Sequence, residues 1–240
     1  MKTINKLGLI ILMTGLIAVL PSTTFAEKYL SGNGNVDKET RNISSFSAID
    51  VSSAFEIYLT QGNSEALVIE ADENLMEHII TEVRGGTLKI YVKGNIRNVK
   101  TMKAYISFKM IDKIELSGAC NIRGEGTYKF NDLDIGVSGA SEINMNLTAD
   151  KVYLNLSGAS EIQFIGSANK LTIDVSGATD VYAQDFEVKE CSIDASGAST
   201  IKVFATKELS VDASGASTVR YKGQPMVNFD TSGASSIRRY

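Results

Sequence analysis

The sequence predicts an all-β protein built as a right-handed parallel β-helix, with about 18–21 residues in each rung and one short helix near the N-terminal end. Three observations indicate this fold: a Ser-Gly-Ala motif recurs, the residues around it alternate between apolar and polar, and equivalent positions carry similar residues. The seven copies begin at Ser117, Ser138, Ser157, Ser176, Ser196, Ser214 and Ser232. The steps between them are 21, 19, 19, 20, 18 and 18 residues, and such a period is typical of a solenoid.

Two apolar columns predict the strands of each rung. The position three residues before the motif holds Ile114, Ile135, Leu154, Ile173, Ile193, Val211 and Phe229, and the position five residues after its first Ser holds Ile122, Ile143, Ile162, Val181, Ile201, Val219 and Ile237. Alternation with a period of two on both sides indicates two strands per rung, each with one buried face. Equivalent strands should stack in parallel, and a right-handed coil is the usual hand of such crossovers.

The motif itself is interpreted as the corner between the two strands. Its glycine allows backbone angles that are closed to other residues, its alanine fits a crowded turn, and its hydroxyl groups can bind backbone groups left unpaired there. A second corner is expected near residues 124–126, 166–169 and 223–225.

Residues 1–26 have the pattern of a signal peptide. Lys2 and Lys6 precede an apolar run of 13 residues, Gly8 to Leu20, and small residues lead to a cleavage site after Ala26. The run is shorter than the roughly 20 residues that cross a bilayer, although an uncleaved anchor is the alternative. We therefore expect an exported protein, located in the periplasm, at the cell surface or outside the cell. The mature chain keeps 22 Lys and Arg against 28 Asp and Glu, and a net charge of −6 argues against a nucleic-acid partner.

The rest of the chain is predicted to be a flexible lead-in, residues 27–41, followed by a single domain, residues 42–240. Within it, residues 42–116 form irregular N-terminal rungs and residues 117–240 the regular repeats. Ile49 to Leu59 is interpreted as a degenerate first rung in which Ser53 takes the place of the motif glycine. The segment 72–83 has apolar residues at helical spacing, with Asp72 as a candidate N-cap, and predicts the short helix.

The two cysteines, Cys120 and Cys191, lie four rungs apart in the repeat. At about 4.8 Å for each rung they would be about 19 Å apart, whereas bridged Cα atoms lie within about 7 Å of each other. We therefore predict two free thiols, with Cys191 as a small buried residue in an apolar column.

No catalytic, cofactor-binding or metal-binding residue is predicted. His78 is the one histidine, and a surface or capping role is preferred for it. Asp50, Asp174, Asp194, Asp212 and Asp230 share the position two residues before the motif, and a ladder of carboxylates could bind Ca²⁺ or act as an acid/base pair. The preferred interpretation is a solvated face whose like charges discourage sheet-to-sheet aggregation, because calcium usually needs a loop that surrounds it.

The corner hydroxyls and a few aromatic residues are further candidates for a ligand site. Regular hydroxyl arrays can bind ice or glycans, but the column four residues after the first Ser is too mixed for a lattice match (Asn121, Glu142, Glu161, Asp180, Thr200, Thr218, Ser236). Tyr153 and Tyr182 are expected to point outward, and two isolated tyrosines are weak support for a glycan groove.

Several stretches resemble the head GIN domain family, the putative auto-transporter adhesins of exported bacterial proteins. The resemblance covers about residues 41–240 and rests on Phe46 to Ala54, Leu59 to Gly62, Ala71 to Leu75, Gly86 to Ile90, the serial corners and Tyr221 to Pro225. It implies a β-helix-like fold and an exported location. The family carries no site residues that could be transferred to this chain.

The leading functional hypothesis is an exported, non-enzymatic structural or binding module of the cell envelope, adhesin-like by family resemblance. Its partner would be a glycan or an envelope component. One alternative is a carbohydrate-active β-helix enzyme that uses carboxylates of neighbouring rungs. Another is self-assembly end to end through the last rung, unless Arg238 and Arg239 block that edge with their charges.

Overall fold

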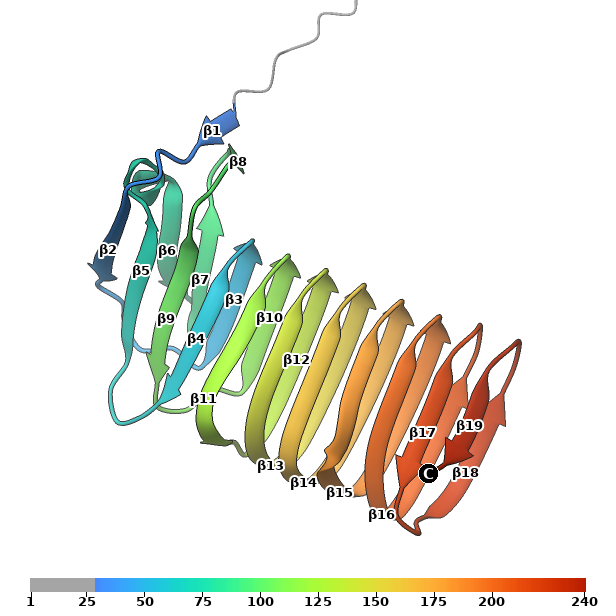
Figure 1. The fold of residues 1–240 in the computed structure, drawn as a ribbon. Coiled ribbons are helices and arrows are strands. Elements are labelled where there is room, and N and C mark those ends of the chain that lie inside the picture. The colour runs from blue at the N-terminus through green and yellow to red at the C-terminus, as the bar shows by residue number, and fades with distance from the viewer. Residues whose placement is uncertain (1–28) are drawn as a thin grey trace, which may run out of the picture.

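The computed structural model describes residues 29–240, so the predicted signal peptide and its cleavage site lie outside the described residues. The chain forms a long coil of strands that is closed at its N-terminal end by a group of further strands (Figure 1). The predicted all-β solenoid with one short helix is confirmed. Among residues 29–240, no helix is both long and apolar enough to span a membrane.

Each rung contributes one strand to each of two facing sheets. The repeat strands are β10 (Lys113–Gly118), β11 (Asn121–Lys129), β12 (Asp132–Gly139), β13 (Glu142–Gly158), β14 (Glu161–Gly177), β15 (Asp180–Gly197), β16 (Thr200–Ala213), β17 (Thr218–Lys222), β18 (Met226–Thr231) and β19 (Ser236–Arg239). Strands β13 to β16 bend at the second corner and therefore belong to both sheets.

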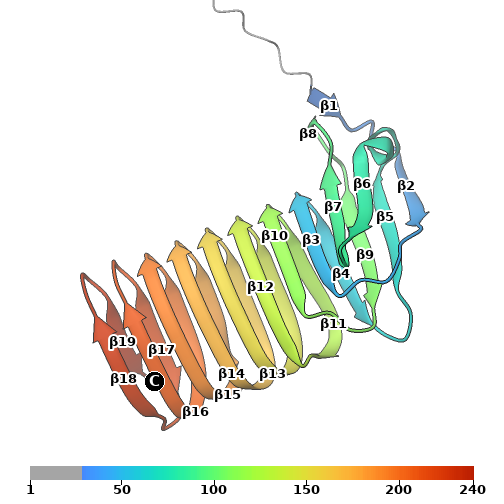
Figure 2. The same ribbon diagram turned by 180° about the vertical axis from the view of Figure 1, so that it is seen from behind.

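The two sheets are named from their place in Figure 1. The rear sheet holds the strands that run up to each motif, and Figure 2 shows it from its own side. The front sheet holds the strands that run down from each motif: β11, β17, β19 and the first halves of β13 to β16. The chain rises at the back, turns over the corner and descends at the front, so that it advances as a right-handed coil.

Equivalent residues of successive rungs pair in register along the whole repeat. In the rear sheet Ile135 pairs with Leu154, and Ile173 pairs with Ile193. Both predicted apolar columns are buried in the rungs before the last one, with exposed fractions of at most 2%. Full burial of each aliphatic side chain stabilises the fold by about 1.5–3 kcal/mol, so that every rung depends on its neighbours.

Stacking gives the corner glycine a second role beyond the turn. Gly139 has a φ of 126° and lies directly on the corner of the preceding rung. A Cβ atom at this position would be 2.3 Å from the carbonyl oxygen of Gly118. The predicted bend is confirmed, and the contact shows that a side chain would also push neighbouring rungs apart.

The fourth residue of the motif points inward and links the rungs. The Ser141 hydroxyl accepts a hydrogen bond from the Cys120 amide at 3.2 Å and donates one to the Gly118 carbonyl oxygen at 3.5 Å. Ser160 repeats both contacts with Ser141 and Gly139 at 3.3 Å. The prediction that the corner hydroxyls bind the backbone is therefore confirmed.

The first rung pairs with the repeat on one side and is covered on the other side by further strands, which precede and follow it in the sequence. That rung consists of β3 (Ala48–Ser53) and β4 (Glu56–Gln61), which pair in register with β10 and β11, as predicted. The added strands are β2 (Val36–Arg41), β5 (Ala66–Asp72), β6 (Ile79–Arg84), β7 (Thr87–Val92) and β9 (Met102–Phe108). The rear sheet continues from β3 through β7 to β6, and the front sheet from β4 through β9 and β5 to β2. We call this group the cap.

Two expectations for the N-terminal part differ from the structure. The helix is a 3-10 helix, η1 (Glu73–His78), rather than a segment that reaches residue 83, because residues 79–84 join the cap as β6. The segment expected to be a flexible lead-in contains β1 (Tyr29–Ser31), which pairs with β8 (Asn95–Arg97), and β2, which pairs with β5. The partner strands β8 and β5 lie far away in the sequence, so no local pattern predicts these pairings.

Asp72 does not cap the helix with its side chain. Its buried carboxylate instead accepts hydrogen bonds from the backbone amides of Gly34 at 2.6 Å and Lys100 at 2.8 Å. Burial raises the pKa of Asp72, but these hydrogen bonds outweigh it and hold the pKa below its ordinary value. Asp72 thus ties two loops to the cap.

The C-terminal end lacks a comparable cover among the described residues. Val227 and Phe229 continue columns whose preceding members, Leu209 and Val211, are buried, yet they are 49% and 38% exposed. Met226 is 75% exposed. The apolar interior therefore comes to the surface at this end.

Candidate functional site

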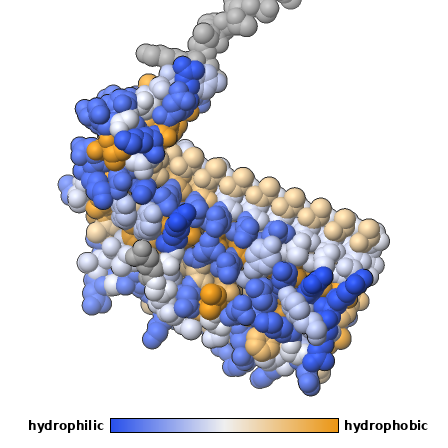
Figure 3. All heavy atoms as spheres, in the orientation of Figure 1, coloured by the Kyte–Doolittle hydropathy of each residue, from blue (hydrophilic) through white to orange (hydrophobic). Residues whose placement is uncertain are grey.

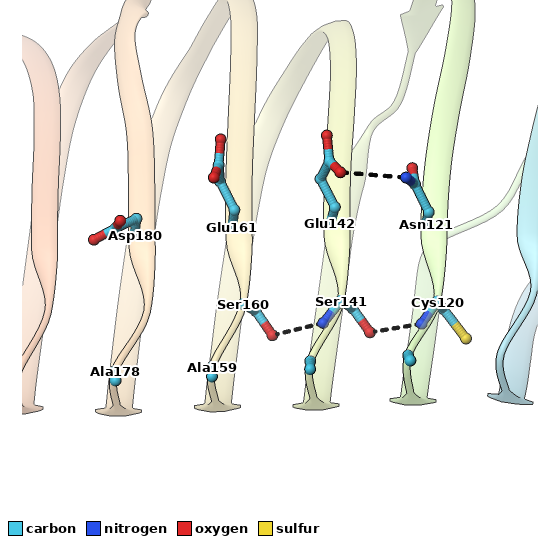
Figure 4. A pocket seen from close by; sticks show the side chains of 11 residues that line it. Cys120, Asn121, Ser141, Glu142, Ala159, Ser160, Glu161, Ala178 and Asp180 are labelled. Carbon is cyan, nitrogen blue, oxygen red and sulfur yellow. Dashed lines mark hydrogen bonds between the residues drawn. The ribbon is translucent and has the colours of Figure 1, made fainter.

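The polar residues that could take part in binding or catalysis lie on open surfaces of the solenoid. One such surface is a shallow groove of about 470 Å³ beside the corners, shown in Figure 4. One side is a row of exposed alanines, Ala119, Ala140, Ala159 and Ala178, and the other is a column made of Asn121, Glu142, Glu161 and Asp180. Figure 3 shows the apolar row along the corner edge.

The carboxylates of this groove stand side by side. Glu142, Glu161 and Asp180 pair in register on adjacent strands and all face the solvent side of one sheet. Glu142 accepts hydrogen bonds from the side-chain amides of Asn121 at 3.2 Å and Asn144 at 2.6 Å. Asp180 accepts one from the Tyr182 hydroxyl at 3.3 Å.

The Asp ladder is present on the rear sheet, on four consecutive rungs as predicted. Asp174, Asp194, Asp212 and Asp230 are exposed and stand on successive rungs in register. Asp50 is separated from them by three other residues of the column and forms an ion pair with Lys89 at 3.2 Å. Within residues 29–240, no group of three or more His, Cys, Asp or Glu side chains is arranged to hold a metal ion.

His78 stays apart from both carboxylate columns. It lies at the end of η1 in the cap, where its Nε2 atom is 3.5 Å from Glu77 Oε1. The ladder stands in the last four rungs, so that the structure does not bring these groups together.

Both thiols are free and Cys191 is buried, as predicted, and Cys120 is buried as well. Cys120 occupies the fourth motif position at the bottom of the groove, and Cys191 lies inside the solenoid. Burial raises the pKa of the Cys120 thiol, and it raises that of Cys191 to about 12. Neither thiol is therefore in a reactive state near neutral pH.

A stacked pair of tyrosines lies on the front sheet, where β4 of the first rung meets β9 of the cap. The rings of Tyr58 and Tyr105 are 5.0 Å apart, and their hydroxyls donate hydrogen bonds of 2.8 Å to Glu56 and Glu70. The ammonium groups of Lys103 and Lys38 lie 5.7 Å and 5.1 Å from the two ring centres. The two rings are neighbours only because β4 pairs with β9. The sequence pattern does not indicate this pairing.

A cluster of cations covers the last three rungs of the front sheet. Lys202, Arg220 and Arg238 pair in register on β16, β17 and β19 and face outward. We call them, together with Lys222 in the neighbouring column, the basic patch. Figure 3 shows strongly hydrophilic side chains at this end of the face. The sequence analysis did not identify this concentration of cations, because it depends on which rungs also lack carboxylates.

The basic patch and the Asp ladder occupy opposite faces of the same rungs. The rear sheet carries Asp194, Asp212 and Asp230, whereas the front sheet carries Lys202, Arg220 and Arg238. The overall charge of −4 hides this separation. A binding partner therefore meets different charges on the two faces.

The solenoid, its corner motifs and its capped end now allow comparison with known proteins. The model of the family described as "Putative auto-transporter adhesin, head GIN domain" matches residues 45–225. The chain belongs to this family. The head GIN domain of this protein thus comprises the first rung, the cap without β2, and the repeat as far as β17. None of the curated proteins compared with the chain matches it.

Solved structures share the fold of this head GIN domain. A putative adhesin from Bacteroides fragilis NCTC 9343 matches with a TM-score of 0.83 and 20% identity over 88% of this chain and 100% of the other. A putative adhesin from Parabacteroides distasonis ATCC 8503 has a TM-score of 0.71 and 18% identity over 89% and 100% of the two chains. A putative lipid binding protein from the same organism has a TM-score of 0.68 and 29% identity over 89% and 100%.

Proposed function

We propose that this head GIN domain is a non-enzymatic binding module that is exported to the bacterial cell envelope or surface. The observation that carries the proposal is the open arrangement of its polar columns: they lie on flat, solvated sheet faces beside shallow grooves. Binding sites for extended partners have this form, whereas catalytic carboxylates need unequal surroundings and exclusion of water. The adhesin-like family supports the proposal.

The test separates binding from turnover. The full chain is expressed with its leader, purified from the exported fraction, and applied to a glycan array and to solutions of neutral and acidic polysaccharides. We expect binding without any change in polymer length. Turnover that disappears in Asp194→Asn would contradict the proposal and favour the enzyme. Cell fractionation and the mass of the N-terminal peptide test export and cleavage after Ala26.

A second candidate function is self-assembly, favoured by the exposed apolar end. Within residues 29–240, β18 pairs only with β16 and β19 only with β17, so each has an unpaired edge, and Met226, Val227 and Phe229 are exposed beside it. Edges of this kind pair with other strands unless charges or a cover prevent it. Sedimentation at rising concentration tests this function: growth in mass that Val227→Lys removes would support it, and a constant monomer would reject it.

A further inference from the structure

We propose that the basic patch binds a linear acidic polysaccharide that lies across the strands, along the solenoid axis. This inference deepens the proposed binding function and depends on it.

The central cations of the patch have no acidic partner. Among the described residues, neither Arg220 nor Arg238 forms an ion pair within 4.0 Å, and Lys202 contacts the ring of Tyr182 instead, with its Nζ atom 4.7 Å from the centroid. Lys222 reaches Asp185 at 3.2 Å. Like charges directly opposite each other on neighbouring strands destabilise a sheet. A bound anion would therefore reduce the electrostatic repulsion among the cations of the patch.

Three cations further up the front sheet have acidic partners. Lys103 and Arg123 both contact Glu56, at 3.7 Å and 3.1 Å, and Lys38 contacts Glu70 at 3.1 Å. The last three rungs differ because the column that supplies carboxylates further up the sheet, at Glu142, Glu161 and Asp180, holds Thr200, Thr218 and Ser236 instead. The patch is therefore cationic because uncharged Thr and Ser residues take the positions that hold carboxylates in the preceding rungs.

The columns on both sides of the cations suit a sugar polymer. Hydroxyl groups of Thr200, Thr218 and Ser236 flank one side and can exchange hydrogen bonds with sugar hydroxyls. On the other side stand the rings of Phe204 and Tyr240, which can contact the apolar face of a sugar ring. Guanidinium groups bind carboxylate or sulfate with two parallel hydrogen bonds. A sugar residue of an extended chain is similar in length to one rung, about 4.8 Å.

Other anionic partners fit this surface less well. Nucleic acid needs many cations, and the same rungs carry the Asp ladder on their other face. A membrane surface would need apolar side chains that enter the bilayer together with the charges. The exposed apolar residues of the last rungs, Met226, Val227 and Phe229, lie on β18 of the rear sheet, whereas the basic patch lies on the front sheet. An acidic polysaccharide is therefore the partner that the chemistry favours.

The experiment compares ligands and variants that differ in charge alone. The exported full chain is titrated with polygalacturonate, with its methyl-esterified form, and with vesicles of phosphatidylcholine containing or lacking phosphatidylglycerol. The variant Arg220→Gln/Arg238→Gln removes two patch cations. The control Lys189→Gln/Lys207→Gln removes two exposed cations outside the patch. Melting temperatures verify that both variants are folded.

We expect polygalacturonate to bind and the esterified polymer to bind far more weakly. The patch variant should lose at least about tenfold in affinity through its lost charge-assisted hydrogen bonds, and the control less than about twofold. Equal loss in both variants, equal binding of both polymers, or binding to anionic vesicles alone would overturn the polysaccharide proposal. Ligands found on the glycan array that bind independently of the patch would overturn it as well, but leave the binding module standing. Turnover without retained ligand would contradict the proposed function itself.

Discussion

Gly118 stacks on Ser53 so closely that a Cβ atom at position 118 would lie 2.4 Å from the Ser53 carbonyl oxygen. Both residues have positive φ angles, 103° at Gly118 and 92° at Ser53. Gly118 has the first rung beneath it. Ser53 belongs to that first rung, and the pairing of β3 with the cap ends at Val51. A side chain is therefore tolerated at the corner of the first rung and excluded from the next.

Replacement of Gly118 by alanine should destabilise the protein by about 3 kcal/mol or more, because backbone strain and steric overlap each cost about 1–3 kcal/mol. Gly126 is the matched control, since it has the same φ of 103° and no atom within 4 Å of a Cβ. Gly126→Ala should therefore show the strain alone. Urea denaturation of both variants measures the difference, and equal losses would contradict the stacking argument.

The reverse change, Ser53→Gly, should stabilise the protein. A residue with a side chain at positive φ costs about 1–2 kcal/mol, and glycine loses part of this gain through the entropy of the unfolded chain. We expect a net gain of about 0.5–1 kcal/mol and a higher melting temperature. A lower melting temperature would show that the Ser53 side chain has a stabilising contact.

The two cysteines should respond oppositely to replacement by serine. Cys120 takes the position where other corners have a hydroxyl, and its Sγ lies 3.6 Å from the Ser53 carbonyl oxygen. Cys120→Ser should therefore be neutral or stabilising. Cys191 lies between Leu171 and Leu209 in an apolar column, so Cys191→Ser should cost about 1–3 kcal/mol. Thermal denaturation compares the two, and similar effects would contradict the assignment.

The stability of the cap should depend on pH through Glu70. The hydrogen bond from Tyr105 lowers the pKa of Glu70 from 4.5, so the contribution of this carboxylate is complete above pH 4.5 and is lost as the pH falls through the lowered value. The same bond raises the pKa of Tyr105 to about 12, and its contribution is lost as the pH rises from 10 toward that value. Stability should thus decline at both ends of this range.

Tyr105→Phe should cost about 1–2 kcal/mol at pH 7 and less at pH 3, because hydrogen bonds to charged groups are the stronger ones. Tyr153→Phe removes an exposed hydroxyl on the rear sheet and serves as the control. Urea denaturation at the two pH values gives the comparison. A loss at Tyr105 that does not change with pH would contradict the role of the charge.

The Asp ladder should behave as a repulsive solvated face. Asp194→Asn should stabilise the protein by a few tenths of a kcal/mol at low salt, since like charges on neighbouring strands repel, and the gain should fade as salt screens them. Millimolar Ca²⁺ should not change the melting temperature of the parent protein. A rise with Ca²⁺ that Asp194→Asn removes would assign a calcium site to the ladder.

The fold could be predicted far into the chain because stacking contacts repeat with the motif. Ile135 pairs with Leu154 one period later, and each further pair follows the same interval. The candidate site was predicted less well. The Asp ladder is visible in the sequence as a column. The lack of an ion pair at Arg220 and Arg238 within residues 29–240 is apparent only from the contacts of the front sheet.

The sequence by itself determined the solenoid, the corner role of Ser-Gly-Ala, the free thiols and the degenerate rung at Ser53, because each depends on residues one or a few periods apart. The tertiary structure alone decided the cap, the pairing of Tyr58 with Tyr105 and the exposed apolar end at Phe229. Antiparallel pairing between distant strands follows no period, and exposure depends on what covers a strand. Neither property is encoded in local alternation.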